Sequence, residues 1–379
     1  MTRLARPERR GADSGRTHGR FFLPRLAIAL AGWVLASCGD AGRVPGAPSR
    51  PGDTRVASAP DPQEAARLVQ RLDARTEGAR APSVFRGATG WLFLPAENQL
   101  RRARRAADLT RPAAPGGDPA TASDPLGAIR DFDRQLRSRG IALLFVPVPT
   151  KLAVYPELLA DLPLADGVPR LDPAVVDLFR TLESEGIATL DLWDEFVARR
   201  QPESDPLYLA TDTHWSPRGA ELAARTVAER LRRLGFAPRP GPQPCAVAQR
   251  PEQRVQITGD LARFDRTSAE PPGETVLLRP VERPSREAAS SGPREILVLG
   301  DSHLAIWRDP PSGFVDHLEL ELCRPVDEVS VQAGGATASR QRLSRQPELL
   351  AGKRIVVWVI SSRLLVSGPP WLPVAISPK

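Results

Sequence analysis

Residues 124–149, DPLGAIRDFDRQLRSRGIALLFVPVP, join an amphipathic helical pattern directly to an apolar run. Leu126, Ile129 and Phe132 recur at helical spacing, and Gly140 ends the pattern. The residues after Gly140 are almost all apolar, which is typical of a strand buried on both faces. A helix joined by a short turn to such a strand is the repeating unit of an α/β fold.

The same alternation continues along the chain. Further strands are predicted at 187–193, 295–299, 326–332 and 354–360, and helices at 171–185, 217–234, 313–323 and 340–350. Short apolar runs that alternate with amphipathic helices predict a mainly parallel sheet covered on both faces. Residues 237–294 are rich in proline and lack a periodic pattern, so we predict an irregular excursion from this core.

The first residues have the pattern of an export signal. An arginine-rich segment leads into LAIALAGWVLAS, 26–37, whose length is typical of a secretory signal and short for a membrane-spanning helix. Cys38 follows at once, and LASC resembles the site at which bacterial lipoproteins are cleaved and lipidated. The alternative is an uncleaved N-terminal anchor. We therefore predict a periplasmic protein that is tethered to a membrane as a lipoprotein through Cys38.

Composition predicts how the rest of the chain is organised. Residues 39–80 are rich in proline, glycine, alanine, arginine and serine, which is typical of a flexible tether. The predicted organisation is a signal peptide at 1–37, a tether at 38–83, a folded domain at 84–366 and a C-terminal tail at 367–379.

The charge of the chain does not indicate nucleic acid as a partner. The formal net charge is +7, but residues 1–37 hold seven arginines, one glutamate and one aspartate, which leaves about +2 for the remainder. No dense basic run or zinc-finger spacing occurs there, so we predict no nucleic-acid binding. The sequence also lacks CxxC and HExxH motifs, so no metal site and no cofactor are predicted.

The chain contains three cysteines, and two of them lie in the predicted body. Cys245 and Cys323 are an even pair in an oxidising compartment. They either form one disulfide or remain two separate buried thiols.

The stretch ILVLGDSH, 296–303, carries a candidate nucleophile. It places Ser302 at the carboxyl end of a predicted strand, which is where functional residues collect in parallel sheets. At the start of a helix, free backbone N–H groups and the helix dipole favour a developing oxyanion. The alternative is that Asp301 or Ser302 only caps the helix.

The stretch TDTHWSPRGA, 211–220, carries a candidate base. Residues two apart in an extended segment point to the same side, so Asp212 can orient the ring of His214 while its other nitrogen faces a serine. A serine hydroxyl needs such a base to become a nucleophile. The two stretches together predict a catalytic triad of Ser302, His214 and Asp212. The alternative is that this stretch only shapes a turn and caps the helix from Pro217.

The two motifs, in this order and about ninety residues apart, resemble the signature of the AlgX/AlgJ group of SGNH hydrolase-like proteins. Other stretches extend the resemblance over about 84–366: GATGWLFL (87–94), VPVPTKLAVYPE (146–157), TGDLARF (258–264), GFVDHLELEL (313–322), VSVQAGG (329–335) and VVWVISSRLL (356–365). The resemblance implies an SGNH-hydrolase-like three-layer α/β sandwich with a mainly parallel sheet. The chain order Asp, His, Ser is circularly permuted relative to ordinary SGNH esterases.

The resemblance also implies a function. Ser302 would accept an acetyl group and pass it to hydroxyl groups of a secreted polysaccharide, such as alginate. A membrane-bound O-acyltransferase would be the partner that supplies the acetyl group. The alternatives are a carbohydrate acetylesterase with the same triad and a non-catalytic scaffold for exopolysaccharide assembly.

Several further residues are candidates for the site. The backbone N–H groups of Ser302 and of Gly334 or Gly335 are the candidate oxyanion hole, although a plain turn also explains the two glycines. Lys151, Tyr155 and Arg363 follow predicted strands and are candidates to line the site. A basic residue at a strand end is usually solvated, so structural roles remain open for them.

Overall fold

The computed structural model describes residues 60–78, 83–113, 115–116, 118, 121–165, 167–201, 204–237, 248–265, 273–282 and 294–376. Their central element is a five-stranded sheet in the order β10-β9-β11-β3-β4, in which every neighbouring pair is parallel. The strands are β3 (Ala142–Val148), β4 (Ala188–Thr189), β9 (Ile296–Gly300), β10 (Asp327–Ser330) and β11 (Ile355–Ser361). The predicted α/β fold with a parallel sheet is confirmed.

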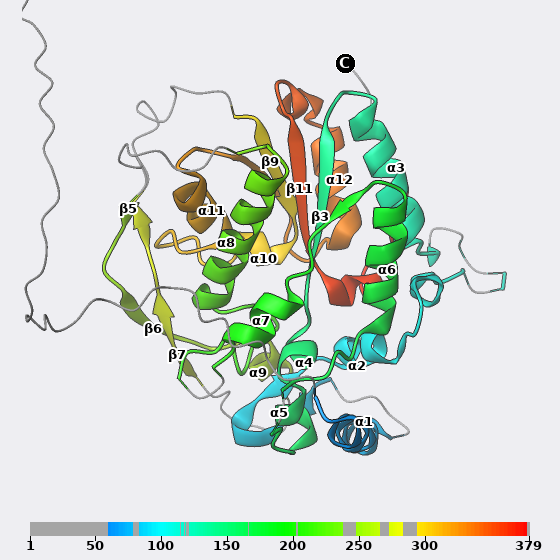
Figure 1. Ribbon diagram of the computed structural model, residues 1–379, viewed down its shortest axis with the longest axis vertical. Helices are drawn as coiled ribbons and strands as arrows, with labels where there is room; N and C mark the ends of the chain where they lie inside the picture. The colour runs from blue at the N-terminus through cyan, green and yellow to red at the C-terminus, as the bar shows by residue number, and fades with distance from the viewer. Residues whose placement is uncertain are drawn as a thin grey trace, which may run out of the picture. The chain divides into compact units, whose positions relative to one another are not determined.

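Helices cover both faces of the sheet, as Figure 1 shows. One face packs against helices that include α7 (Trp193–Arg199), α8 (Pro217–Arg233) and α11 (Phe314–Leu322), and the other against α3 (Pro125–Arg137), α6 (Pro173–Ser184) and α12 (Gly335–Ser344). Val357 and Val359 of β11 belong to the first buried cluster, and Val356 and Trp358 belong to the second. This alternation follows from the two-residue period of a strand and produces three layers.

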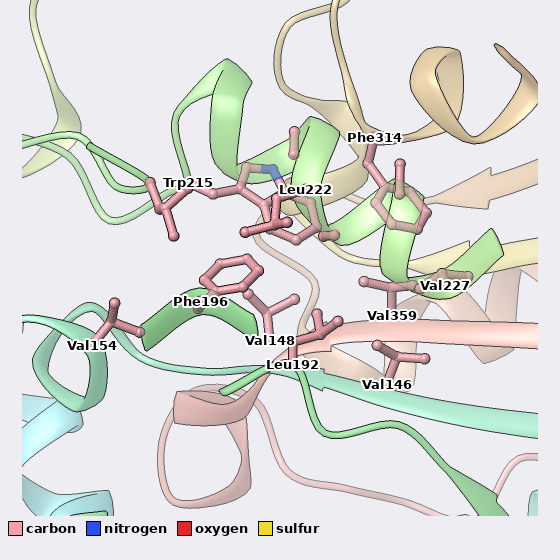
Figure 2. Close-up of a cluster of buried hydrophobic side chains, with 14 of the residues drawn as sticks. Val146, Val148, Val154, Leu192, Phe196, Trp215, Leu222, Val227, Phe314 and Val359 are labelled. Carbon is pink, nitrogen blue, oxygen red and sulfur yellow. The ribbon is translucent and has the colours of Figure 1, made fainter. Parts of the chain in front are cut away.

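The first cluster anchors the segment that contains His214. Figure 2 shows Trp215, the next residue, among buried side chains from α7, α8, α11 and the sheet. Its ring stacks on Phe314 with centroids 5.6 Å apart. Because both rings are fully buried, this contact fixes the backbone beside His214 to the core.

Two helices begin as their sequences predict. The Asp124 side chain accepts a hydrogen bond of 2.9 Å from the Gly127 N–H at the start of α3, and Ser216 accepts one of 3.1 Å from Gly219 at the start of α8. Both helices have proline at their first position, where the missing N–H is not needed.

The predicted tether is wrong for residues 62–76, which form helix α1 (Pro62–Thr76). Its Leu68 and Leu72 lie one helical turn apart and are fully buried. They pack in the first cluster, and α1 contacts α5 (Pro156–Ala160). The many arginines and alanines of this segment resemble a linker in composition, but the apolar spacing is helical.

The predicted irregular excursion at 237–294 contains regular structure where it is described. Strands β6 (Gln253–Ile257) and β7 (Glu274–Leu278) pair antiparallel, as do β5 (Ala248–Gln249) and β8 (Val281–Glu282). The short helix α9 (Asp260–Phe264) lies between β6 and β7. These strands are too short and too polar to give a clear signal in the sequence. The remaining α-helices and strands of the described residues are β1 (Phe85–Arg86), β2 (Leu92–Phe93), α2 (Pro95–Arg102), α4 (Lys151–Val154) and α10 (Ser302–Ala305).

The predicted signal segment and Cys38 lie outside the described residues. Within the described part of the chain, no helix is long and apolar enough to cross a membrane. Cys323 is disulfide-bonded. Cys245 also lies outside the described residues, so the pairing of Cys245 with Cys323 stays a prediction. The C-terminal segment packs onto the domain through Trp371, which is buried against Trp358.

Candidate active site

Ser302 lies at the end of β9, which has a neighbouring strand on each side. Gly300 ends this strand in a place without room for a side chain, because a Cβ atom there would meet the Val359 carbonyl oxygen at 2.3 Å. Asp301 then caps α10: its carboxylate accepts the His303 N–H at 2.9 Å and the Ser361 N–H at 2.8 Å. These bonds fix the start of α10 to the end of β11. The capping interpretation of Asp301 is therefore correct, and it leaves the Ser302 hydroxyl free for other partners.

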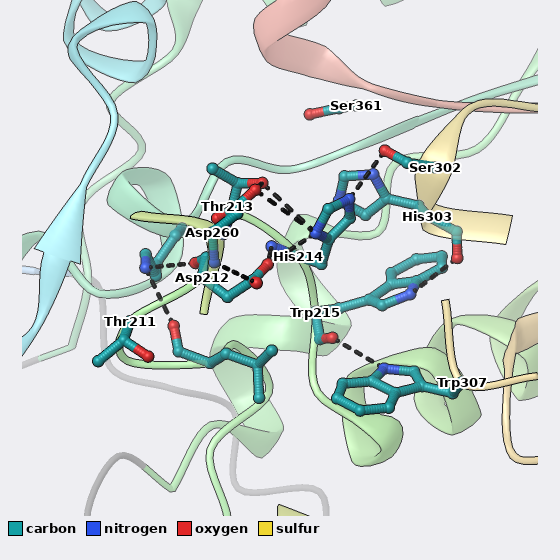
Figure 3. Close-up of polar contacts among 12 residues, drawn as sticks. Thr211, Asp212, Thr213, His214, Trp215, Asp260, Ser302, His303, Trp307 and Ser361 are labelled. Carbon is teal, nitrogen blue, oxygen red and sulfur yellow. Dashed lines mark hydrogen bonds and ion pairs between the residues drawn. The ribbon is translucent and has the colours of Figure 1, made fainter. Parts of the chain in front are cut away.

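The hydroxyl of Ser302 contacts His214. Its Oγ lies 2.8 Å from His214 Nε2, and His214 Nδ1 lies 2.7 Å from Asp212 Oδ1 (Figure 3). Because Asp212 accepts the proton on Nδ1, Nε2 is left to accept the hydroxyl proton of Ser302. Asp212 is buried, whereas Ser302 and His214 are partly exposed. The three residues have the geometry of a nucleophile, its base and the carboxylate that orients the base.

Asp212 is held by more than the imidazole. Its Oδ1 also accepts the His214 N–H at 2.9 Å, and its Oδ2 accepts the Asp260 N–H at 2.8 Å. Burial raises the pKa of Asp212, but the hydrogen bond and charge of His214 and these two N–H groups outweigh it and hold that pKa below its ordinary value. The carboxylate therefore stays ionised and can stabilise an imidazolium on His214.

Asp260 of α9 is a second carboxylate close to His214. It accepts hydrogen bonds from the Thr213 N–H at 2.8 Å and the Thr213 hydroxyl at 2.7 Å, and its Oδ2 lies 3.9 Å from His214 Nδ1. Gly259 allows this approach, since a Cβ atom there would meet the Thr211 carbonyl oxygen at 2.1 Å. The excursion thus supplies a residue of the site that the sequence analysis did not assign.

The ligand atoms of Asp212, His214 and Asp260 lie within 4.8 Å of one another, which is the only such group of metal-ligating side chains among the described residues. The hydrogen bonds above already involve the atoms that would bind an ion. Asp212 and His214 face each other as acceptor and donor, and both oxygens of Asp260 face Thr213. This donor and acceptor set fits proton transfer through a histidine.

Residues 209–214, here called the base loop, are held by a buried lysine. Lys151, the first residue of α4, directs its ammonium group to three backbone carbonyls: Leu209 at 3.0 Å, Ala210 at 3.2 Å and Asp212 at 2.7 Å. The three N–H groups of the ammonium match the three acceptors. Lys151 is 1% exposed, so the expectation of a solvated strand-end lysine is wrong. It lies beneath the site and holds the loop that carries the base.

Glu274 of β7 anchors the other side of the base loop. Its carboxylate accepts the N–H groups of Ala210 at 2.9 Å and Thr211 at 3.0 Å. Indole hydrogen bonds then join the loop to α10, because Trp215 Nε1 donates to the His303 carbonyl at 3.1 Å (Figure 3). The position of His214 therefore depends on contacts from several segments.

Burial changes the proton affinity of Lys151. Desolvation lowers its pKa to about 8, against the opposing charges of Glu97, Glu274, Asp212 and Asp260. Glu97 of α2 is itself buried, and desolvation raises its pKa despite the charge of Lys151.

This shift leads to a prediction on stability. Between pH 8 and the ordinary value of 10.5, the unfolded chain keeps the Lys151 proton and the folded chain does not. Unfolding then takes up a proton, so a rising pH favours the folded state. The free energy of unfolding of the wild type, minus that of Lys151→Met, should increase over this window by about 1 kcal/mol per pH unit.

Urea unfolding of both proteins at several pH values measures this difference. Methionine keeps an unbranched side chain of nearly the same length as lysine and removes the ionisable group. If the free energy of unfolding of the wild type minus that of Lys151→Met does not change between pH 8 and 10.5, Lys151 titrates above this pH range. A difference that falls as the pH rises would mean that its pKa is raised, which contradicts the dominance of desolvation.

The other two candidates to line the site, Tyr155 and Arg363, lie in different environments. Tyr155 is a core residue and not a lining one: it is fully buried against Trp91, and its hydroxyl accepts the Leu207 N–H at 2.9 Å. Arg363, after β11, is partly exposed and lies next to the base loop, with Nη2 3.5 Å from the Thr213 hydroxyl.

Gly334 and Gly335 lie at the start of α12, which follows β10, an immediate neighbour of β9 in the sheet. Gly335 has a φ of +62° and packs against Pro369. Among the described residues, no hydrogen bond links either glycine to Ser302. Their assignment to an oxyanion hole stays a prediction.

Comparison with known proteins identifies the family. The model of the family described as "SGNH hydrolase-like domain, acetyltransferase AlgX" matches residues 84–362, which is most of the chain. The chain belongs to this family. The resemblance that the sequence motifs carry is confirmed.

Individual relatives agree with this AlgX-family assignment. A probable alginate O-acetylase AlgJ of Pseudomonas aeruginosa is 28% identical over 220 residues, which cover 56% of this chain and 48% of the relative. The AlgJ protein of Azotobacter vinelandii is 26% identical over 46% of this chain and 40% of its own length. The chain thus spans about half or less of the length of these curated relatives.

Two solved structures share the AlgX-family fold. The O-acetyltransferase domain of Pseudomonas putida AlgJ has a TM-score of 0.52 at 22% identity, covering 76% of this chain and 94% of that one. Pseudomonas aeruginosa AlgX has a TM-score of 0.53 at 19% identity, and the likeness covers 80% of this chain and 67% of that one. At these identities the likeness concerns the fold alone.

Proposed function

We propose that this protein is an O-acetyltransferase that moves an acetyl group through Ser302 onto a hydroxyl group of a secreted polysaccharide. One observation carries the proposal: the Ser302 hydroxyl lies 2.8 Å from His214 Nε2, while Nδ1 lies 2.7 Å from a buried, ionised Asp212. Membership of an acetyltransferase family supports the choice of acyl group.

The first half of the reaction acetylates the enzyme. His214 Nε2 takes the hydroxyl proton of Ser302 as Oγ forms a bond to the carbonyl carbon of an acetyl ester. The carbonyl electron pair moves onto oxygen, and Asp212 stabilises the imidazolium. When the carbonyl reforms, the bond to the leaving group breaks and that group takes the proton from His214. The product is an acetyl ester on Ser302.

The second half transfers the acetyl group. An acceptor hydroxyl replaces the leaving group, gives its proton to His214 and bonds to the acetyl carbon. The bond to Ser302 then breaks, and Ser302 recovers its proton from His214. Water in place of the sugar hydroxyl would make the same chemistry an esterase reaction. The outcome depends on which acceptor the site binds and how well it excludes water.

Incubation of the purified protein with an acetyl ester tests the proposal, with and without oligosaccharide acceptors that include alginate fragments. We expect the mass of one acetyl group on an acceptor in the complete reaction and none in a reaction without enzyme. Release of acetate at an equal rate with and without every acceptor would favour the esterase. The absence of both products would favour a non-catalytic scaffold.

We further propose that Cys38 is lipidated and tethers the protein to a membrane, where a membrane-bound O-acyltransferase supplies the acetyl group. The small residues before Cys38 support this proposal, because they match a lipoprotein cleavage site. Cys38→Ser should move the protein from the membrane fraction to the soluble periplasmic fraction. Retention of the variant in the membrane fraction would indicate an uncleaved helical anchor instead.

A further inference from the structure

We propose that the Arg363 guanidinium is a catalytic residue that binds the oxyanion formed during acetylation and transfer. This inference rests on the proposed function, since it concerns the charge that develops when Ser302 attacks a carbonyl. In many hydrolases backbone N–H groups stabilise the oxyanion, whereas here a side chain would do so.

The first observation is that one backbone donor used in other hydrolases is occupied. In α/β-hydrolases the N–H of the residue after the nucleophile contributes to the oxyanion hole. Here that residue is His303, and its N–H donates to Asp301 Oδ1 at 2.9 Å. The same carboxylate also holds the Ser361 N–H at 2.8 Å. Asp301 is fully ionised, because its hydrogen bonds and the charge of His303 outweigh burial and hold its pKa far below the ordinary value. Both N–H groups are therefore already bound to Asp301, and the Ser302 N–H stays the backbone candidate to which Arg363 would add a charged donor.

The second observation is the position of Arg363. Val359 of β11 lies opposite Gly300 of β9, and the N–H of Ser361, two residues further on, donates to Asp301, the residue before Ser302. Arg363 Nη1 is 3.1 Å from Ser361 Oγ, and Nη2 is 3.5 Å from the hydroxyl of Thr213, the residue before His214. The guanidinium thus bridges the strand end beside the nucleophile and the loop that carries the base. Figure 3 shows Ser361 and Thr213 around the pair formed by Ser302 and His214.

The third observation is that Arg363 has donors to spare. Among the described residues no carboxylate forms an ion pair with it, whereas Arg200, Arg279 and Arg308 each have one. A guanidinium offers five N–H donors, and in the described part of the chain two hydroxyl oxygens accept from Arg363. Because it is partly exposed and always charged, it can donate hydrogen bonds to a developing negative charge. No proton transfer is required: the N–H groups donate hydrogen bonds to the oxygen while the Ser302 proton moves to His214.

Acetylation by a neutral ester, such as 4-nitrophenyl acetate, tests this role, because the substrate has no charge for Arg363 to recognise. We expect Arg363→Ala to lower the rate of acetylation at saturating ester by about 10²- to 10³-fold, with KM and thermal stability nearly unchanged. Added guanidinium chloride should restore part of the rate, whereas sodium chloride at equal ionic strength should not. If Arg363→Ala does not fold, Arg363→Gln takes its place in the same acetylation assay, with the same expected loss of rate.

Arg342 provides the matched control. It is an exposed arginine on α12 for which the described residues offer no ion-pair partner, so Arg342→Gln should keep the wild-type rate. A wild-type rate in both Arg363 variants would overturn the inference and leave the acetyl-Ser302 pathway intact. A loss confined to KM, or a loss without guanidinium rescue and with lower thermal stability, would overturn it as well. If the wild type itself forms no acetyl ester on Ser302, the proposed function fails and the inference fails with it.

Discussion

Ser302→Ala is expected to lower turnover by about 10⁶-fold, the loss found when a triad serine is removed from another serine enzyme. The physical reason is that His214 Nε2 then has no hydroxyl to deprotonate, so no acetyl ester forms. Asp301 and not Ser302 caps α10, so the fold should survive the change. Loss of one hydrogen bond to His214 should cost about 1 kcal/mol of unfolding free energy.

Mass spectrometry after incubation with an acetyl ester or a serine-directed phosphonate measures this result. The wild type should carry the adduct on Ser302, and the variant should carry none. Ser330→Ala is the matched control, because Ser330 ends β10 and its hydroxyl, among the described residues, bonds to Arg308 and Glu328 and not to the triad. An adduct on another residue, or full turnover in Ser302→Ala, would contradict the assignment of the nucleophile.

Asp212→Asn should lower turnover by about 10⁴-fold, the loss recorded for the same change in a serine protease. An amide cannot stabilise an imidazolium by charge. If its NH₂ group faces Nδ1, the histidine must hold its proton on Nε2, and Ser302 then has no acceptor. The free energy of unfolding should fall by only about 1 kcal/mol, because asparagine keeps an oxygen for one of the two backbone N–H groups that Asp212 accepts and loses the other.

Asp260→Asn distinguishes the two carboxylates near His214. Asp260 lies 3.9 Å from Nδ1 and bonds directly to Thr213, so its loss should reduce turnover far less than the loss of Asp212. Steady-state kinetics of Asp212→Asn and Asp260→Asn with the same ester show which of the two carboxylates orients His214. Near-normal turnover in Asp212→Asn, with a large loss in Asp260→Asn, would make Asp260 the residue that orients the base.

The sequence predicted the parts of the fold that short stretches encode. The apolar runs at 142–148 and 355–361 are buried on both faces, so periodicity and composition identify them as strands of a parallel sheet. The pairing of Asp212 with His214 is equally local, because the two residues are two positions apart. Ser302 could be placed beside them only because strand ends in such a sheet meet at one edge.

The contacts that position the base could not be predicted in this way. Lys151 is fixed by carbonyl groups about sixty positions along the chain, and a lone lysine after a strand has no local mark of burial. Asp260 likewise meets Thr213 across 47 positions. Helix α1 was missed for another reason: its composition resembles a linker, and its apolar spacing covers only a few residues.

The base loop has a consequence for how the protein loses activity. Ser302 follows a strand of the sheet, whereas His214 depends on a segment held by side chains of Lys151, Glu274 and Asp260. Release of this segment breaks those contacts and leaves the sheet hydrogen bonds intact, so it costs less free energy than global unfolding. We therefore expect mild denaturant or heat to open this segment first and to lower activity while the sheet is still folded.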